Sequence, residues 1–298
     1  MVDINTATEA TPSVQTTTNS VPVRQESILS KEIDIAQVEQ IARNAGTIIA
    51  EYREKGVELS FKASDENVSR QVQTEADLAS ERFLKLNLLA LHGCDFYGEE
   101  EGGKLLDSGD QWVVDPLDGT ENLMGYPPVL GVSIGLMRDG KPYMGVIYDV
   151  MSGTVFAAEV GKGARMNGRE IHVSEETDPK RAIVAMDFSS KASTRPVSLA
   201  QMGRVLETAR SVKTFGAPVL ALSAVAAGQL EVFSRPSTKP PDMVAGVVIA
   251  QEAGAKVLDY DGKPYDVRTS KGIVVGPPAM VDAYMPCFLP QPSTTPVV

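Results

Sequence analysis

The spacing of apolar residues changes along this 298-residue chain, and the change restricts the folds open to it. Apolar residues recur at helical spacing over residues 35–52, and residues 74–77 provide an N-cap and an acidic first turn for a second helix that reaches about Leu91. Short strands follow, and after about residue 180 strands and helices alternate. We therefore expect an α/β fold, with an α+β first half and an α/β second half, in one continuous body.

The expected elements of the body are short and closely spaced. They are strands at 95–98, 111–114, 130–137, 143–148 and 154–158, a helix at 198–208, a strand at 212–215, a helix at 219–227, a strand at 230–233, a helix at 242–253, and strands at 256–259 and 272–275. Turns at 138–141 and 151–153 are typical of hairpins. Residues 259–262 begin like an aspartyl-phosphate motif, but Lys263-Pro264 follows where a hydroxyl is needed, so we expect a turn there.

The two ends of the chain differ in composition from the body. Residues 1–28 have no hydrophobic period and are expected to be disordered. Residues 290–298 are rich in Pro, Ser and Thr and are expected to form a flexible tail. The body between them, residues 29–289, is expected to consist of two fused halves, 29–180 and 181–289.

Charge and composition exclude several classes of protein. Acidic residues outnumber basic ones, 39 to 28, for a formal net charge of −11, so we expect no nucleic-acid partner. The sequence has neither an apolar run of about 18 residues nor a signal-peptide pattern, so we expect no membrane partner. Cys94 and Cys287 have no partner motif and are expected to be buried free thiols in a reducing cytoplasm.

The segment after one apolar strand carries the most chemical information. The strand ends at Asp115, Pro116 gives a rigid exit, Asp118 follows, and Gly119-Thr120 can begin a helix. Two carboxylates, the Leu117 carbonyl and a helix N-terminus are thereby brought together. Oxygen ligands suit Mg²⁺, and a helix N-terminus suits a phosphate. Taken alone, the segment is also compatible with an ordinary turn followed by an N-cap.

Further acidic residues follow similar structural signals. Glu99 comes directly after the strand at 95–98, whereas Glu101 is expected on the solvated surface. Asp242 follows two prolines and opens a helix, where an N-cap role is the simpler interpretation. His92 and His172 are isolated, so any metal here must be held by oxygen.

Four motifs in order resemble the inositol monophosphatase family of lithium-sensitive, magnesium-dependent phosphatases. They are Thr74…Asp77, Gly98-Glu99-Glu100, Asp115-Pro116-Leu117-Asp118-Gly119-Thr120 and Pro241-Asp242-Met243-Val244-Ala245-Gly246. The likeness covers roughly residues 35–285. It implies a layered αβαβα sandwich of the inositol monophosphatase and sugar phosphatase type, usually a homodimer. It also implies two or three Mg²⁺ ions per site and inhibition by Li⁺.

The resemblance also implies a role for each motif residue. The implied metal ligands are Glu99, Asp115, the Leu117 carbonyl, Asp118 and Asp242. The implied catalytic residues are Glu99 and Thr120, which would orient a metal-activated water, and Asp77, which belongs to a further metal's water shell or to the activation network. The implied substrate-binding residues are Asp118, Gly119, Thr120, Gly216 and Ala217, and Arg235 is a further candidate at a position where the chain departs from the family. No covalent phospho-enzyme is expected.

The departures from the family pattern lie on the substrate side. Thr120 is followed by Glu121, Pro241 stands in place of a Trp, and Pro218 stands where the family often has Ala. Seven positions before Asp242, where an acid usually contacts inositol hydroxyls, the chain has Arg235. A guanidinium prefers a second phosphate or a carboxylate, unless it points to solvent.

The expected function is therefore Mg²⁺-dependent hydrolysis of a small phosphate monoester, with inositol monophosphate as the first candidate. Fructose 1,6-bisphosphate, 3′-phosphoadenosine 5′-phosphate and histidinol phosphate are the alternative substrates. A non-catalytic regulatory homologue is the alternative of a different class.

Overall fold

The computed structural model describes residues 1, 32–57, 60–61, 72–125, 127–188 and 192–289. The chain divides into two compact units, Met1–Glu32 and Ile33–Val298. Only the two end residues of the first unit are described, so the disorder expected for residues 2–28 lies outside the described part, as does the expected tail at 290–298. All elements below belong to the second unit.

A seven-stranded sheet forms most of the first half, with strand order β3-β4-β5-β6-β7-β8-β9. Its strands are β3 (Asp95–Gly98), β4 (Asp110–Asp118), β5 (Gly131–Arg138), β6 (Lys141–Asp149), β7 (Thr154–Glu159), β8 (Ala164–Met166) and β9 (Arg169–Ile171). Only β3 and β4 are parallel within it. The β5–β6 turn is tight because Asp139 and Gly140 both adopt positive φ, at 47° and 75°, as the expected hairpin requires. A short separate pair, β1 (Ser60–Phe61) and β2 (Val72–Gln73), precedes this sheet.

A five-stranded mixed sheet belongs to the second half, with order β11-β10-β12-β14-β13. Its strands are β10 (Ile183–Met186), β11 (Ser211–Lys213), β12 (Val232–Arg235), β13 (Lys256–Leu258) and β14 (Ile273–Gly276). Alternate residues of β12 pack on opposite faces: Val232 belongs to an outer apolar cluster and Phe233 to an inner one. This sheet is therefore covered on both faces.

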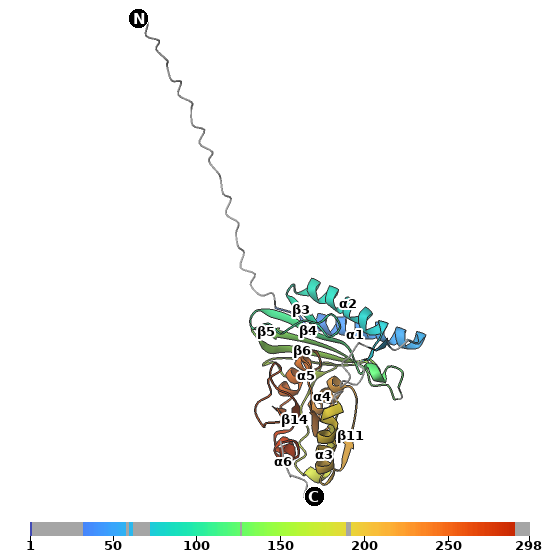
Figure 1. Ribbon diagram of the computed structural model, residues 1–298, viewed down its shortest axis with the longest axis vertical. Coiled ribbons are helices and arrows are strands. Elements are labelled where there is room, and N and C mark those ends of the chain that lie inside the picture. Colours follow the sequence, from blue (N-terminus) through green and yellow to red (C-terminus); the bar gives the residue numbers. More distant parts are fainter. Residues whose placement is uncertain (2–31, 58–59, 62–71, 126, 189–191, 290–298) are drawn as a thin grey trace. The chain divides into compact units, whose positions relative to one another are not determined.

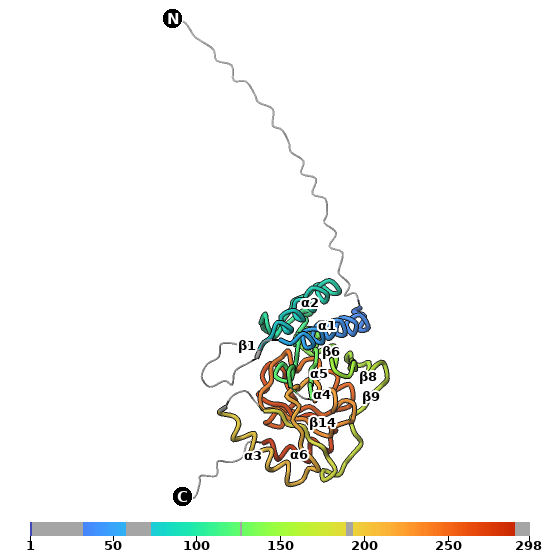
Figure 2. Tube along the Cα trace, turned by 90° about the vertical axis from the view of Figure 1, so that its right-hand side faces the viewer, coloured from blue at the N-terminus to red at the C-terminus, as the bar shows by residue number. Residues whose placement is uncertain are grey.

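The helices complete five layers, as the resemblance implied (Figures 1 and 2). The helices are α1 (Ile35–Lys55), α2 (Glu75–Leu91), α3 (Arg195–Leu206), α4 (Pro218–Ala226), α5 (Pro240–Glu252) and α6 (Pro278–Phe288). Helices α1 and α2 cover the outer face of the seven-stranded sheet, α4 and α5 lie between the two sheets, and α3 and α6 cover the far face of the second sheet. The fold is thus a mixed α/β sandwich.

Helix α5 packs against the seven-stranded sheet at backbone contact. Ten of its thirteen residues are buried. Gly135 and Gly145 on the facing strands make this possible, because a Cβ at Gly145 would lie 2.3 Å from the Ala245 carbonyl oxygen, and one at Gly135 would lie 2.4 Å from Val244. The close approach places the first turn of α5 beside the ends of β4 and β5.

Several expected boundaries are corrected by the structure. The helix expected at 242–253 begins at Pro240, so Lys239 is the N-cap and the N-cap role considered for Asp242 is wrong. Strand β4 continues through Pro116 to Asp118, because a register shift between Asp115 and Asp118 accommodates the proline as a bulge. Strands β1, β2, β8, β9 and β10 and helix α6 were not predicted.

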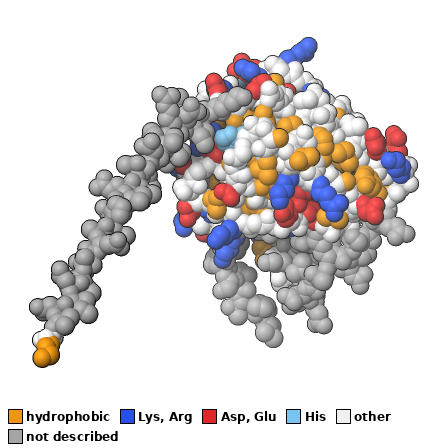
Figure 3. Space-filling view, turned by 90° about the horizontal axis from the view of Figure 1, so that it is seen from above, with side chains coloured by type: hydrophobic (Ala, Val, Ile, Leu, Met, Phe, Trp, Pro, Cys, Tyr) orange, Lys and Arg blue, Asp and Glu red, His pale blue; other side chains and the backbone are white. Residues whose placement is uncertain are grey.

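The described part of the chain also shows its surface charges and its two cysteines. Within the described residues, none of the helices combines the length and apolar character needed to cross a membrane. On the face shown in Figure 3, Lys and Arg side chains are scattered among acidic and apolar ones. Cys94 and Cys287 are free thiols, although both are half-buried and not fully buried.

Candidate active site

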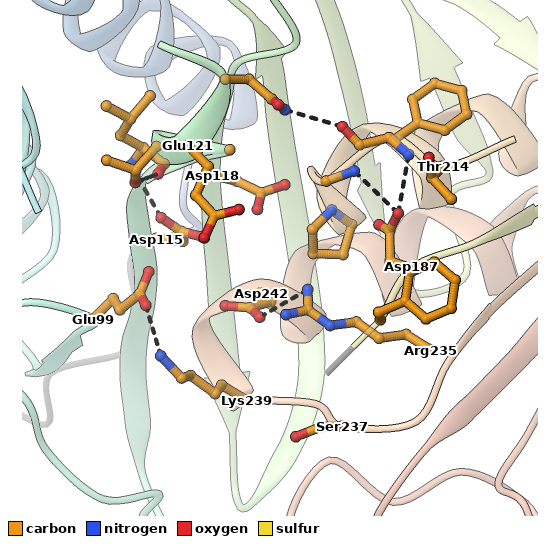
Figure 4. Close-up of a pocket in the computed structure, with 18 of the residues that line it drawn as sticks. Glu99, Asp115, Asp118, Glu121, Asp187, Thr214, Arg235, Ser237, Lys239 and Asp242 are labelled. Carbon is orange, nitrogen blue, oxygen red and sulfur yellow. Dashed lines mark hydrogen bonds and ion pairs between the residues drawn. The ribbon is translucent and has the colours of Figure 1, made fainter. Parts of the chain in front are cut away.

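A cavity of about 750 Å³ opens where the acidic end of the first sheet meets the second half of the chain (Figure 4). One wall comes from the residues after β3 and from the end of β4. The other comes from the segments after β10, β11 and β12. The lining residues include Glu99, Asp115, Leu117, Asp118, Gly119, Thr120, Gly216, Arg235 and Asp242, which brings nearly all of the sequence-predicted site residues together.

Three carboxylates form the acidic centre of this cavity. One oxygen each from Glu99, Asp115 and Asp242 lies within 4.8 Å of the others. Parallel pairing of β3 and β4 brings Glu99 beside Asp115, and the Glu99 N–H donates to the Val114 carbonyl at 3.0 Å. The first turn of α5 contributes Asp242. Three segments distant in sequence thus converge on one point.

The electrostatics of this centre favour a bound cation. Asp115 is 1% exposed, and burial together with Glu99 and Asp118 raises the pKa of its carboxyl well above its ordinary value. Burial raises the pKa of Asp242 to about 6, although Arg235 opposes the shift, and burial and Asp242 raise the pKa of Asp118. A divalent cation relieves such like-charge crowding, and an all-oxygen donor set fits a hard ion such as Mg²⁺.

Asp118 and Leu117 lie beside the acidic centre but make additional internal contacts. The Val219 N–H at the start of α4 donates to Asp118 Oδ2 at 2.8 Å, so this carboxylate also ties β4 to α4. The Leu117 N–H donates to Asp115 Oδ1 at 3.0 Å, and the Leu117 carbonyl lies 3.1 Å from the Thr120 hydroxyl. Metal ligation by Asp118 and by the Leu117 carbonyl stays a prediction.

Thr120 begins a helix, as the sequence predicted, and this helix is a single 3₁₀ turn of three residues, Thr120–Asn122. Gly119 precedes it with φ 86°, a conformation that glycine adopts at little cost. A Cβ at Gly119 would also lie 2.4 Å from the Val129 carbonyl oxygen. One helical turn has only a small dipole, so phosphate binding here depends on individual N–H groups and less on a helix end.

The Thr120 hydroxyl lies against Asp77, 43 positions earlier in the chain. It is 2.9 Å from Asp77 Oδ1, and the second Asp77 oxygen accepts from the Thr74 N–H at 2.8 Å in the capping box of α2. Burial raises the pKa of Asp77 to about 6. Asp77 therefore reaches the site through Thr120, and its carboxylate is placed to accept the threonine's proton.

Arg235 lines the cavity, so the alternative in which it points to solvent is wrong. Its side chain is 21% exposed, and Nη1 lies 3.4 Å from Asp242 Oδ2 (Figure 4). Its Nε is buried and has no hydrogen-bond partner among the described residues. Lys239, which the sequence analysis missed, places its Nζ 2.8 Å from Glu99 Oε1. Arg235 is the last residue of β12, and Lys239 is the N-cap of α5.

Asp187 is a second residue that the sequence analysis missed. It follows β10, and its Oδ1 accepts from the N–H groups of Phe215 and Gly216 at 2.9 and 3.0 Å. The expected substrate-binding N–H of Gly216 is thus used internally. Ala217 is the fully buried N-cap of α4 and is not part of the described cavity lining, so its proposed contact is not supported. Asp187 Oδ2 is buried without a described partner.

Comparisons with known proteins agree with this geometry. The model of the inositol monophosphatase family matches residues 30–286. Inositol monophosphatase 2 of Solanum lycopersicum is 32% identical over 255 residues, covering 83% of this chain and 94% of that protein. Nus factor SuhB of Escherichia coli K12 is 32% identical over 249 residues, covering 82% and 91%. The crystal structure of the extragenic suppressor protein suhB from Bartonella henselae superposes with a TM-score of 0.78 at 27% identity, covering 85% and 97%. This chain belongs to the inositol monophosphatase family.

Proposed function

We propose that the protein is a Mg²⁺-dependent phosphatase that hydrolyses a small phosphate monoester, with inositol monophosphate as the first candidate substrate. The observation that carries the proposal is the convergence of Glu99, Asp115 and Asp242, with oxygens within 4.8 Å, at the wall of a cavity large enough for a small metabolite. The name of the tomato relative supports the same substrate class.

The chain's own residues account for the positioning that phosphoryl transfer needs. Glu99, Asp115, Asp118, Asp242 and the Leu117 carbonyl would hold two or three ions. Bound magnesium supplies positive charge for the phosphate oxygens and lowers the pKa of water.

The nucleophilic water needs orientation in addition to activation. The Thr120 hydroxyl, held 2.9 Å from Asp77, and the Glu99 carboxylate would orient it for in-line attack. The N–H groups of Gly119 and Thr120 would face the phosphate.

Arg235 favours a second candidate, a bisphosphorylated substrate, because its guanidinium lines the cavity. Four carboxylates weigh against it: Asp242 lies 3.4 Å away, and Asp242, Asp118, Asp187 and Glu99 together raise the pKa of Arg235 against the opposing effect of burial. The positive charge is thus largely balanced. This balance supports a substrate with one phosphate as the first candidate.

Phosphate release from a substrate panel tests the proposal. The panel is inositol 1-phosphate, fructose 1,6-bisphosphate, 3′-phosphoadenosine 5′-phosphate and histidinol phosphate, each with Mg²⁺, without it, and with added Li⁺. We expect Mg²⁺-dependent, Li⁺-sensitive release, fastest from inositol 1-phosphate. Arg235→Glu should change the ranking of the bisphosphates relative to inositol 1-phosphate. An unchanged ranking would remove Arg235 from substrate selection.

A non-catalytic regulatory role is the alternative, and the printed name of the Escherichia coli relative, Nus factor SuhB, motivates it. All four acidic motif residues of the predicted metal site, Glu99, Asp115, Asp118 and Asp242, line the cavity, which favours catalysis. A folded, Mg²⁺-binding protein that releases no phosphate from any substrate would favour the regulatory alternative. We further propose that residues 29–289 form the phosphatase domain and that it acts as a cytoplasmic homodimer.

A further inference from the structure

Helix α2 presents a polar stripe to the interior of the protein. Asp77, Ser80 and Glu81 occupy positions i, i+3 and i+4, which places them on one face of the helix, and all three are buried. Polar residues on the buried face of a helix are costly unless each has a partner. Each of the three has one in the segments that form the first wall of the candidate active site, and Asp77 also accepts from Thr74 in the capping box.

The three partners are spaced along the rim of the acidic centre. Asp77 contacts the Thr120 hydroxyl, as described above. Ser80 Oγ donates to the Pro116 carbonyl at 2.9 Å, inside the β4 bulge. Glu81 accepts from two consecutive backbone N–H groups, that of Glu100 at 2.9 Å and that of Glu101 at 2.7 Å. Helix α2 is thereby hydrogen-bonded to both segments that supply acids to the first wall of the cavity, the turn after β3 and the end of β4.

The Glu81 carboxylate is in contact with the turn that carries Glu99. A Cβ at Gly98 would lie 2.3 Å from Glu81 Oε2 and 2.5 Å from its carboxyl carbon. Gly98 does not have a positive φ, so its lack of a side chain is needed for space and not for backbone conformation. The glycine and the glutamate are thus complementary, and the carboxylate fills the position that a side chain at 98 would take.

Burial of the Glu81 carboxylate is unfavourable for the free energy of folding. Its side chain is 5% exposed, burial raises the pKa of its carboxyl, and no Lys or Arg forms an ion pair with it among the described residues. Glu100 and Glu101 nearby add further negative charge. A carboxylate here is best explained by its two backbone hydrogen bonds, which fix the turn more firmly than an apolar side chain could.

We propose that Glu81 is a positioning residue for metal binding: it anchors the Gly98–Glu101 turn so that the Glu99 carboxylate stays within reach of Asp115 and Asp242. The inference rests on the proposed metal-dependent function and extends it to a residue outside the cavity lining. Residues that orient metal ligands typically contribute about 10- to 100-fold to metal affinity.

Glu81→Gln tests the inference, because an amide keeps the size but replaces one acceptor oxygen with a donor facing an N–H group. Mn²⁺ binding, followed by electron paramagnetic resonance, should weaken by about 10-fold or more. The Mg²⁺ concentration for half-maximal phosphate release should rise by a similar factor, while KM at saturating Mg²⁺ changes little. Glu75→Gln is the matched control, since Glu75 lies on the same helix with an exposed side chain.

Gly98→Ala perturbs the same contact, because the added methyl group would meet the Glu81 carboxylate. We expect it to weaken Mn²⁺ binding as well, and the double variant to lose less than the product of the two single effects, because both act on one contact. If Glu81→Gln fails to fold, Gly98→Ala alone decides the matter by the same titration.

Wild-type Mn²⁺ affinity in folded Glu81→Gln, or in folded Gly98→Ala if the first variant cannot be made, would overturn the inference. A wild-type protein that binds Mn²⁺ but releases no phosphate would refute the phosphatase proposal, and the Mn²⁺ titration would still decide the role of Glu81. A wild-type protein that binds no Mn²⁺ would overturn both.

Discussion

Asp115→Asn should stabilise the metal-free protein and destroy its response to magnesium. Asp115 is fully buried, and its neighbours Glu99, Asp118 and Asp242 are all acidic. Its one hydrogen bond in the described structure comes from the Leu117 N–H, which an asparagine oxygen can also accept. The substitution therefore removes repulsion and keeps the local geometry.

The size of the effect follows from the crowding of the carboxylates. Two unit charges 4.8 Å apart, the limit of separation in the cluster, repel by about 3.5 kcal/mol at an effective dielectric constant of about 20. Partial protonation reduces this repulsion, because the raised pKa of Asp115 lets its carboxylate take up a proton. We therefore expect Asp115→Asn to raise the free energy of unfolding by about 1–3 kcal/mol at about pH 7.5 without metal.

Magnesium should make the wild type more stable than Asp115→Asn. A ligand that binds only the folded state at about 100 times its Kd adds about 2.7 kcal/mol, which raises Tm by about 5–11 °C in a domain of this size class. Wild type should gain this stabilisation, and Asp115→Asn should gain little of it. Thermal unfolding with and without Mg²⁺, after treatment with a chelator, measures both quantities in one experiment.

Asp110→Asn on the same strand is the matched control. Arg138 donates to both Asp110 oxygens at 2.9 Å and holds the pKa of that carboxyl below its ordinary value. This variant should therefore lose stability by about 1–3 kcal/mol and keep the full Mg²⁺ response. If Asp115→Asn instead lost stability without metal, or kept the wild-type Mg²⁺ gain, the electrostatic reasoning would be refuted.

Three further predictions concern catalysis, pH and packing. Thr120→Val should lower kcat by about 10²-fold or more with Thr120→Ser near wild type, and equal losses in the two would show that the hydroxyl is not what matters. Because the folded-state pKa of Asp77 is raised to about 6, its contribution to metal-free stability is present below about pH 4 and is lost as pH rises through about 6. Asp77→Asn should reduce this pH-dependent fall in the free energy of unfolding by up to about 3 kcal/mol, measured by urea unfolding at several pH values. An unchanged pH dependence would contradict the prediction. Gly145→Ala should lower the free energy of unfolding by about 3 kcal/mol because its Cβ meets the Ala245 backbone. Gly203→Ala in α3, with open space around it, should raise the free energy of unfolding by about 0.5–1 kcal/mol. Similar values for the two variants in denaturant unfolding would refute the packing argument.

The first helices and the acid at Asp115 were predictable because they leave local signals, whereas Asp242 was assigned to the site only through the family resemblance. Helical spacing predicted the helix that the structure places at Ile35–Lys55, and the Thr74…Asp77 capping box marked the start of the next one. Asp115 stood out because it directly follows a run of apolar residues. These signals need no knowledge of distant parts of the chain.

Asp187 and Lys239 were missed because nothing local distinguishes them. Asp187 follows a strand of four residues that was itself not predicted, and its partners lie 28 and 29 positions later. Lys239 gains its role only by contact with Glu99, 140 positions earlier. Tertiary contacts, and not propensity, decide both.

The late position of α5 has a consequence for how the protein is made. The acids at 99, 115 and 118 are synthesised more than a hundred residues before Asp242, and α5 must enter between two sheets before the cluster exists. Until then the part of the inner face of the seven-stranded sheet that α5 covers, with Gly135 and Gly145, is exposed. Long-range closure of this kind is slow and exposes apolar surface in intermediates. A partly folded chain thus lacks the complete set of acids, and binding of a divalent ion would report that α5 has packed against the first sheet.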